Sequence, residues 1–195
     1  MTFEEAAERL IEVGRFFHSR GWAPATSGNY SARLADGRIL ITVSGAHKGR
    51  LSRSDLMLLE SDDPRRPSAE TALHRALYRD RSDVGAVLHS HGPVSVALGR
   101  ATGGTAWRIA GHELLKALPG IVTHETAVEV PIVENSQDMA EIEQAVAPRL
   151  GGAPAYLIRG HGLYGWGRDI AEAERVVEAL EWLAEAELAE RSFRA

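Results

Sequence analysis

The chain has 195 residues, of which 44% are hydrophobic and 25% are charged, and its formal net charge is -5 at pH 7. This size and composition suit one globular unit with its own core, so we expect a single domain over residues 1–195. The negative charge argues against nucleic acid and anionic membrane surfaces as partners. Because the chain has no cysteine, it has no disulfides, and any metal must be held by His, Asp or Glu.

The first ten residues, "MTFEEAAERL", are acidic and amphipathic, unlike the basic and then apolar start of a secretion signal. No uncharged apolar run in the chain approaches the length of about 18 residues that is typical of a membrane-spanning helix. We therefore expect a cytoplasmic protein.

The N-terminal part of the chain predicts a helix and a hairpin. Thr2 and Glu5 have the spacing of a capping box, and apolar residues then recur at helical spacing until Gly21. The dipeptide Asp36-Gly37 lies between two alternating segments and is the strongest short hairpin signal in the chain. It predicts two antiparallel strands, over about 29–34 and 38–43.

The rest of the chain does not sustain a regular alternation of strands and helices. The polar, proline-broken segment "LLESDDPRRPS" predicts a loop. The later segments predict, in order, a helix in "SAETALHRALYRD" capped by Ser68, a buried strand in "GAVLHSH", short helices in "PVSVALGRA" and "GHELLKALPG", a strand in "VEVPIV", a helix in "SQDMAEIEQAVAPRL", two strands in "AYLIRGHGLYGWG" and a long helix from Asp169. We expect the carboxylates of that long helix to lie on a solvated face. This pattern predicts an α/β or α+β layered fold with a central, mainly antiparallel sheet flanked by helices.

Two histidines end the apolar strand "VLHSH". Residues two apart on a strand face the same side of the sheet, so His89 and His91 present their imidazoles together. An isolated pair of this kind is more often structural, because a metal site needs further ligands. The best third ligand is His161, since Gly160 and Gly162 beside it permit a close approach, although His161 could also merely fill a turn. We predict a site for one divalent ion, zinc, with coordination positions left open for catalysis.

Two segments, "TSGNYS" and "TVSGAHKG", are candidates for holding an anion. Each places hydroxyl residues and a glycine at a strand end, where backbone N–H and O–H groups can point at phosphate oxygens. Either segment could equally be an ordinary turn. Together with Ser68, which precedes Glu70 in "SAET", the candidate phosphate-binding residues are Ser27, Gly28, Asn29, Ser44, Gly45 and Lys48.

The order of the motifs "SGN-x-S", "SG", "SAET-x-LH", "VLHSH" and "RGHG" along nearly the whole chain resembles the class II aldolase/adducin family. The resemblance implies that family's three-layer catalytic domain, one zinc ion per subunit held by His89, His91 and His161, and a phosphorylated ketose as substrate. It also implies a homotetramer with active sites near subunit boundaries.

Within that family, "GWAPATSGNYS", "GHELLKALPG" and "GHGLYGWGRD" resemble the branch that dehydrates a methylthio-substituted ketose phosphate in methionine salvage. This branch removes the C3 proton, so the resemblance implies an acid/base carboxylate. Family aldolases use the glutamate that corresponds to Glu70, and the dehydrating branch uses the one that corresponds to Glu113. We expect Glu113 to be catalytic and Glu70 to come second, although each could be an ordinary carboxylate at a helix start.

Two other functions are compatible with these residues. One is a sugar-phosphate aldolase or epimerase of the fuculose or ribulose phosphate type, which would share the metal and phosphate sites. The other is a non-catalytic module like the adducin head, against which the intact histidine motifs argue. Among the remaining residues, we expect His74 to be structural, whereas Trp22, Trp166 and Tyr164 either contact the methylthio group or fill the core.

Overall fold

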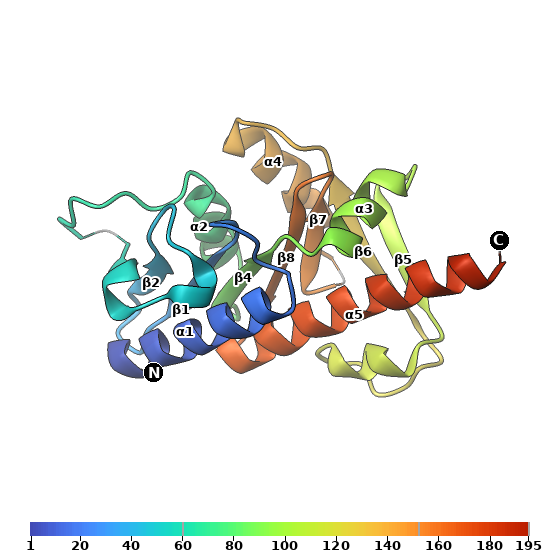
Figure 1. The fold of residues 1–195 in the computed structure, drawn as a ribbon, viewed down its shortest axis with the longest axis horizontal. Coiled ribbons are helices and arrows are strands. Elements are labelled where there is room, and N and C mark those ends of the chain that lie inside the picture. Colours follow the sequence, from blue (N-terminus) through green and yellow to red (C-terminus); the bar gives the residue numbers. More distant parts are fainter. Residues whose placement is uncertain (60, 152, 195) are drawn as a thin grey trace.

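The computed structural model describes residues 1–59, 61–151 and 153–194, and it places one mixed sheet at the centre of the molecule (Figure 1). The strands lie in the order β3-β2-β1-β4-β8-β7-β6-β5. Only β6 and β7 pair in parallel among the described strands, so the predicted mainly antiparallel sheet is confirmed. The strands are β1 (Asn29–Arg33), β2 (Ile39–Thr42), β3 (Leu56–Leu58), β4 (Ala86–Ser90), β5 (Ala106–Ala110), β6 (Ala127–Val133), β7 (Ala155–Ile158) and β8 (Gly162–Gly167).

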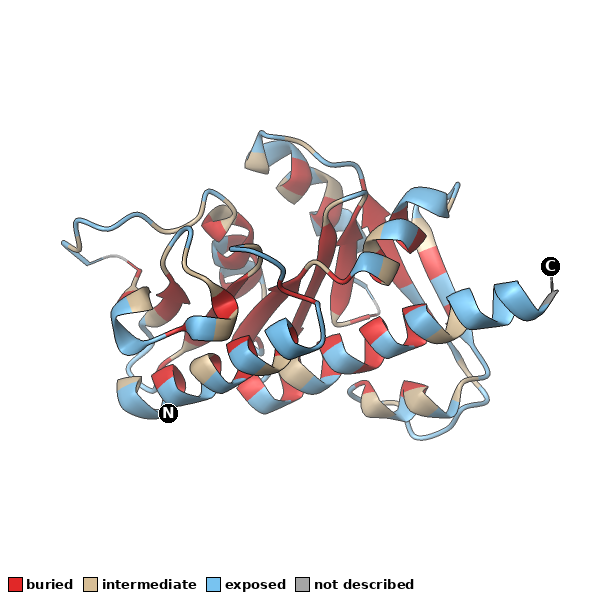
Figure 2. Cartoon of the chain, viewed as in Figure 1, coloured by how far each residue is buried: buried red, intermediate tan, exposed pale blue. Residues whose placement is uncertain are grey.

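Helices cover both faces of this sheet. They are α1 (Phe3–Ser19), α2 (Thr71–Asp80), α3 (Pro93–Ala101), α4 (Met139–Val146) and α5 (Ile170–Arg194), with 3-10 turns at η1 (Lys48–Arg50), η2 (Arg53–Asp55), η3 (Glu113–Ala117) and η4 (Ala147–Arg149). One hydrophobic core joins the sheet to α1, α3 and α5, and a second core joins it to α2 and α4. The predicted layered arrangement is therefore present, and buried residues follow the sheet and the inner sides of the helices (Figure 2).

Side chains of β4 alternate between the two cores, as the period of a strand requires. Ala86 and Leu88 pack in the core of α1 and α5, whereas Val87 packs in the core of α2 and α4. By the same alternation His89 shares the face of Val87, and Ser90 shares the face of Leu88. The residues on either side of the histidine motif thus contact different layers.

The structure differs from the sequence-based expectations in four places. The short strands β3 and β5 were not predicted. The segment "GHELLKALPG" forms a 3-10 turn instead of an α-helix. Ser68 does not cap α2, which begins at Thr71; its Oγ instead accepts the N–H of Glu70 at 3.3 Å. In the described chain, no helix is both long enough and apolar enough to cross a bilayer.

The close contact between β4 and β8 makes a stability prediction. A Cβ on Gly162 would overlap the carbonyl oxygen of Ser90 and lie 3.0 Å from the His89 ring. We expect Gly162→Ala to lower the free energy of unfolding by about 1–3 kcal/mol, the usual cost of overpacking. Gly103→Ala is the matched control, because a Cβ there meets nothing within 4 Å. Urea denaturation that gives equal stability for both variants would contradict this close packing.

Candidate metal centre

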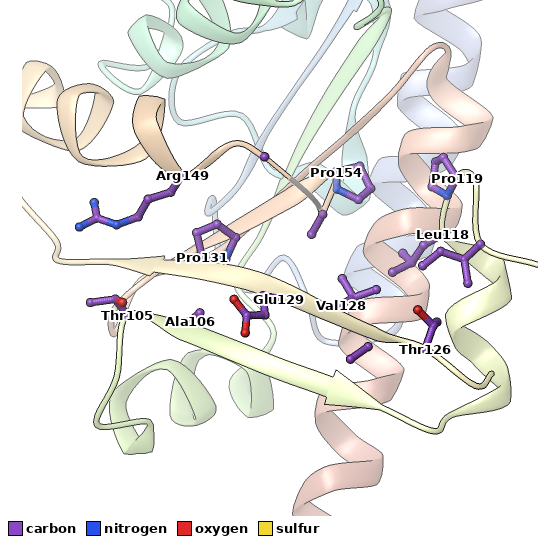
Figure 3. A pocket seen from close by; sticks show the side chains of 14 residues that line it. Thr105, Ala106, Leu118, Pro119, Thr126, Val128, Glu129, Pro131, Arg149 and Pro154 are labelled. Carbon is purple, nitrogen blue, oxygen red and sulfur yellow. The ribbon is translucent and has the colours of Figure 1, made fainter. Parts of the chain in front are cut away.

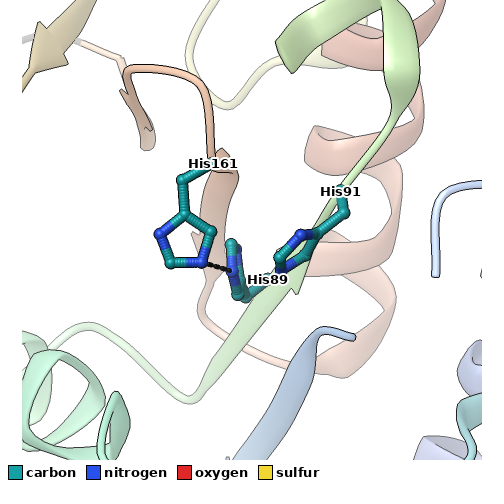
Figure 4. Close-up of side chains that lie close together, drawn as sticks. All are labelled: His89, His91 and His161. Atoms are coloured by element: carbon teal, nitrogen blue, oxygen red, sulfur yellow. Dashed lines mark hydrogen bonds between the residues drawn. The ribbon is translucent and has the colours of Figure 1, made fainter. Parts of the chain in front are cut away.

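Three histidines from separate parts of the chain meet at one end of the central strands (Figure 4). His89 is the fourth residue of β4, His91 follows the strand, and His161 lies in the turn between β7 and β8. The antiparallel pairing of β4 with β8 sets His89 opposite Tyr164 and so brings the two strand ends together. The structure therefore places the three predicted ligands side by side.

The spacing of the imidazole nitrogens fits a metal ion. One ring nitrogen from each histidine lies within 4.8 Å of the other two, and the Nε2 atoms of His89 and His161 are 3.4 Å apart. Two ligands that each lie about 2.0–2.1 Å from a tetrahedral zinc ion are separated by roughly 3.3–3.5 Å. A set of three imidazole nitrogens is also one that zinc accepts.

The tautomer of His89 is set by the neighbouring strand. Its Nδ1–H donates to the backbone oxygen of Leu163 at 3.0 Å, which leaves the Nε2 lone pair directed at the cluster. Burial lowers the pKa of His89 well below its usual value and lowers the pKa of His91 to about 4. Both imidazoles are therefore neutral at pH 7 and have a lone pair available for a metal.

Glu70, just before α2, directs its carboxylate into the histidine cluster. Its Oε1 lies 3.2 Å from His161 Nε2, and its Oε2 lies 3.4 Å from His89 Nε2. Burial alone would raise the pKa of Glu70, but the nearby His161 and His89 and the hydrogen bond from Tyr164 outweigh it and hold the pKa below its usual value. Glu70 is therefore ionised, and it is close enough to contact a metal ion or a substrate bound there.

A chain of buried hydrogen bonds fixes the orientation of this carboxylate. Asn29 Nδ2 donates to Glu70 Oε2 at 2.6 Å, so Asn29 Oδ1 is free to accept a hydrogen bond from His74 Nε2. His74 Nδ1 then accepts from the Ser31 hydroxyl at 2.7 Å, and Ser31 accepts in turn from Tyr78 at 2.8 Å. Every donor points towards Glu70, so the network stabilises its ionised form.

This network gives His74 a more specific place than the structural one expected from the sequence. The His74 ring is fully buried, and burial lowers its pKa to about 4, which keeps it neutral. Tyr164 donates from its hydroxyl to Glu70 at 2.9 Å and stacks on His89 with ring centroids 4.0 Å apart. Trp22 and Trp166 are 1% and 2% exposed and belong to the cores. Side-chain type alone could not separate these roles.

Lys48 connects the two segments that were predicted to hold phosphate. Its Nζ donates to the backbone oxygens of Thr26 at 3.1 Å and Ala46 at 2.6 Å, so one ammonium joins both loops. The side chain is buried, and burial lowers its pKa to about 8, against the opposing attraction of Glu70. A single positive charge thus lies under both loops, on the side of the histidine cluster.

Most of the other candidate phosphate residues already use their polar groups in hydrogen bonds within the chain. Asn29 is held between Glu70 and His74, so its amide is not available to an anion. The Ser27 hydroxyl donates to Pro24, and the Ser44 N–H donates to Arg66. Gly28 has a φ of 77°, and a Cβ there would lie 2.7 Å from the His89 oxygen.

Gly45 and Ser68 complete the set of candidate phosphate residues. Gly45 also has a positive φ, of 75°, and it lies on the surface next to Ser44. Ser68 precedes Glu70 and uses its Oγ on that residue's N–H. Phosphate binding by these residues remains a prediction.

Glu113 does not join the histidines within this chain. It lies on η3, where it forms an ion pair with Lys116 and lies 3.4 Å from Nδ1 of His124, and its side chain is 69% exposed. The hydrogen bond from Lys116 lowers the pKa of Glu113. The nearby cavity of about 700 Å³ is lined by residues of η3 and α5 that include Leu114, Ala117 and Trp182. The two carboxylates expected to share the chemistry therefore occupy different surfaces of one chain.

The cavity shown in Figure 3 is also separate from the histidines. It has a volume of about 600 Å³ and is lined by residues of the β5–β6 hairpin, among them Thr105, Glu129 and Pro131. Arg149 reaches it from the other side. None of its lining residues belongs to the histidine cluster.

The sequence and the geometry agree with comparisons to known proteins. The family model for the class II aldolase and adducin N-terminal domain matches residues 8–188. The chain belongs to the class II aldolase/adducin family. A methylthioribulose-1-phosphate dehydratase from Methylococcus capsulatus is 52% identical over 192 residues, which cover 95% of this chain and 94% of that protein. The dehydratase of that name from Pseudomonas fluorescens is 46% identical over 200 residues, covering 98% and 96%.

Solved structures of the family share the fold. An L-fuculose-1-phosphate aldolase from Thermus thermophilus aligns with a TM-score of 0.79 and 30% identity, over 99% of this chain and 98% of that one. A putative aldolase/epimerase/decarboxylase from Klebsiella pneumoniae aligns with a TM-score of 0.83 and 28% identity, over 97% and 91%. The class II aldolase-like fold expected from the motifs is thereby confirmed.

The histidine cluster makes a prediction about metal content. We expect His91→Ala to weaken metal binding by more than the roughly 10–100-fold that is typical of changes beyond the direct ligands. His124→Ala is the control, because that histidine is exposed and contacts Glu113 instead of the cluster. Elemental analysis after dialysis and competition with a chromophoric chelator measure both variants. Equal metal content in the two proteins would remove His91 from the ligand set.

Proposed function

We propose that this chain is a zinc-dependent methylthioribulose-1-phosphate dehydratase of methionine salvage. The observation that carries the proposal is the cluster of three histidines, two of them in contact with Glu70, in a chain that is 52% identical to a dehydratase of that name. The fuculose phosphate aldolase is only 30% identical, which makes an aldolase or epimerase the second candidate. Incubation with 5-methylthioribulose 1-phosphate separates the two, because dehydration gives a single diketone and water whereas an aldolase gives two fragments.

The steps of the proposed dehydration determine what the residues of the site must do. The C3 proton is removed, its electron pair forms the C3–C4 double bond, and the C4 hydroxyl leaves as water once protonated. The resulting enol then relaxes to 2,3-diketo-5-methylthiopentyl 1-phosphate. Zinc held by His89, His91 and His161 would supply Lewis-acid stabilisation of the negative charge that develops next to the C2 carbonyl. The chain itself must provide the group that moves the proton and the donors that hold the phosphate.

We assign the proton transfer to Glu113 and a supporting role to Glu70. Glu70 already accepts hydrogen bonds from Asn29 and Tyr164, so its ionised form is stabilised and it is a weak base. Glu113 is exposed in one chain, but burial against another copy would raise its pKa towards the working range of a general base.

An oligomer, which we propose to be a tetramer, would bring Glu113 to the metal centre of a neighbouring chain. The exposed apolar side chains of α5 support such an interface, since Trp182 is 46% exposed and Leu188 is 56% exposed.

Substitutions of the two glutamates test which of them transfers the proton. We expect Glu113→Gln to lose a factor on the order of 10²–10⁴ in turnover while it keeps its metal, because the amide cannot accept the C3 proton. Glu70→Gln should lose only about 10–100-fold through a disturbed metal environment. Turnover, metal content and exchange of the C3 hydrogen with deuterated solvent are the measurements. Loss of exchange in Glu70→Gln alone, with zinc still bound, would transfer the role to Glu70.

Mixing two inactive variants tests whether Glu113 acts on a neighbouring chain. His91→Ala chains and Glu113→Gln chains are each inactive alone, but unfolding and refolding them together would form hybrid oligomers. If each site combines the histidines of one chain with Glu113 of another, about a quarter of the sites in random hybrids are intact. Light scattering verifies the assembly. Hybrids that form and remain inactive would show that both residues serve the site of the same chain.

The pKa of Lys48 makes a prediction about pH. Its ammonium is charged below a pKa of about 8 and loses the charge as the pH rises through that value. If it holds the substrate phosphate, the KM of the enzyme should rise between pH 7 and pH 9 while kcat changes less. Lys48→Met should have a KM roughly 10–100-fold higher at pH 7, as expected for the loss of a charged hydrogen bond, and no such rise with pH. A KM that rises equally in the variant would exclude this role.

A further inference from the structure

A second buried carboxylate lies beneath the histidine motif, on the opposite face of the sheet. Glu181 belongs to α5 and is 1% exposed, although the helix was expected to keep its carboxylates in solvent. Its Oε1 accepts the hydroxyl of Ser90 at 2.6 Å and the hydroxyl of Ser95 at 3.0 Å. The backbone N–H of Gly92 also donates to this carboxylate.

These contacts bracket His91. Ser90 precedes it, Gly92 follows it, and Ser95 lies in the first turn of α3, so one carboxylate holds both sides of the ligand and the helix after it. The packing is close, since a Cβ on Gly92 would overlap the Glu181 carboxylate. The N–H of His91 itself donates to the backbone oxygen of Trp22 at 2.7 Å. The backbone of this ligand is therefore fixed from several directions.

Burying a carboxylate in this place is costly. In the described part of the chain, hydrogen bonds and not a cation compensate Glu181, and the charged group that acts on it is Glu185 of its own helix. An apolar side chain of similar size would fill the space without that desolvation cost. Glu181 does what an apolar residue could not do: it accepts hydrogen bonds from three donors and so holds them at fixed positions.

We propose that Glu181 is a positioning residue that keeps His89 and His91 in their metal-binding geometry. It acts through Ser90 and Gly92 and does not itself reach the metal, because it lies on the α5 side of β4 while the imidazoles lie on the α2 side. The inference rests on the metal centre of the proposed function and is independent of which reaction that centre catalyses.

The test uses Glu181→Gln in the full-length protein, freed of metal and then titrated with Co²⁺ and Zn²⁺. The amide can still accept from Ser90 and Ser95, but its NH₂ group would face the N–H of Gly92, where two donors oppose each other. We expect the affinity for both ions to fall about 10–100-fold and the visible absorption spectrum of bound Co²⁺ to change. Glu178→Gln, about one turn earlier on the same helix and exposed, should match the parent in both measurements.

A second variant keeps the test decisive if Glu181→Gln does not fold. Ser90→Ala removes a single hydroxyl between the two ligands, and it should also weaken Co²⁺ binding and alter the spectrum. Combining it with Glu181→Gln should cost less than the sum of the two single changes, because Ser90 and Glu181 belong to one hydrogen-bond network and their effects are coupled. Parent-like affinity and spectrum in the folded variants would overturn the proposal, even if their metal-free forms melt at lower temperature. A parent protein that binds neither ion would instead refute the metal centre itself.

Discussion

The metal centre depends on the hydrogen-bonded pairing of β4 with β8. This register sets His89 opposite Tyr164 and Ser90 opposite Leu163, and it brings the turn that carries His161 to the end of β4. A slip of one residue would turn His89 towards α5 and Ser90 towards the site, since alternate side chains face opposite sides of a strand. The pairing of β1 with β4 adds a second constraint, because it sets Asn29 opposite His89. The site is therefore a property of three strands in fixed register.

Two buried carboxylates contact this part of the sheet from its opposite faces. Glu70 approaches the imidazoles on the side of α2, and Glu181 holds the intervening backbone from the side of α5. Each accepts hydrogen bonds from neutral donors: Asn29 and Tyr164 serve the first, and Ser90 and Ser95 serve the second. Fixed neutral donors orient a carboxylate while leaving it able to respond to a cation. A buried arginine partner would instead compete with the metal for Glu70.

Local patterns were enough to predict much of the fold and the clustering of the three candidate ligands. The capping box at Thr2, the hairpin at Asp36-Gly37 and the spacing of His89 and His91 are all short-range signals, and the structure contains the elements they indicate. Two short strands, β3 and β5, escaped because their pairing depends on partners distant in the sequence. His74 and Glu181 escaped for a related reason. Their roles arise from contacts 45 and 91 residues away, with Asn29 and Ser90, which no local pattern encodes.

The separation of Glu113 from the histidines follows from how the fold uses its helices. The inner face of α5 packs in the core and carries Glu181. Its outer face contacts η3 and borders the groove beside Trp182. A proton-transferring group placed there cannot reach the histidines of its own chain without displacing this layer. The hydrogen bond from Lys116 lowers the pKa of the exposed Glu113, and burial by another surface would raise it. If assembly supplies that cover, the base becomes active only where a metal centre is also present, and a free subunit has a metal site without a competent base.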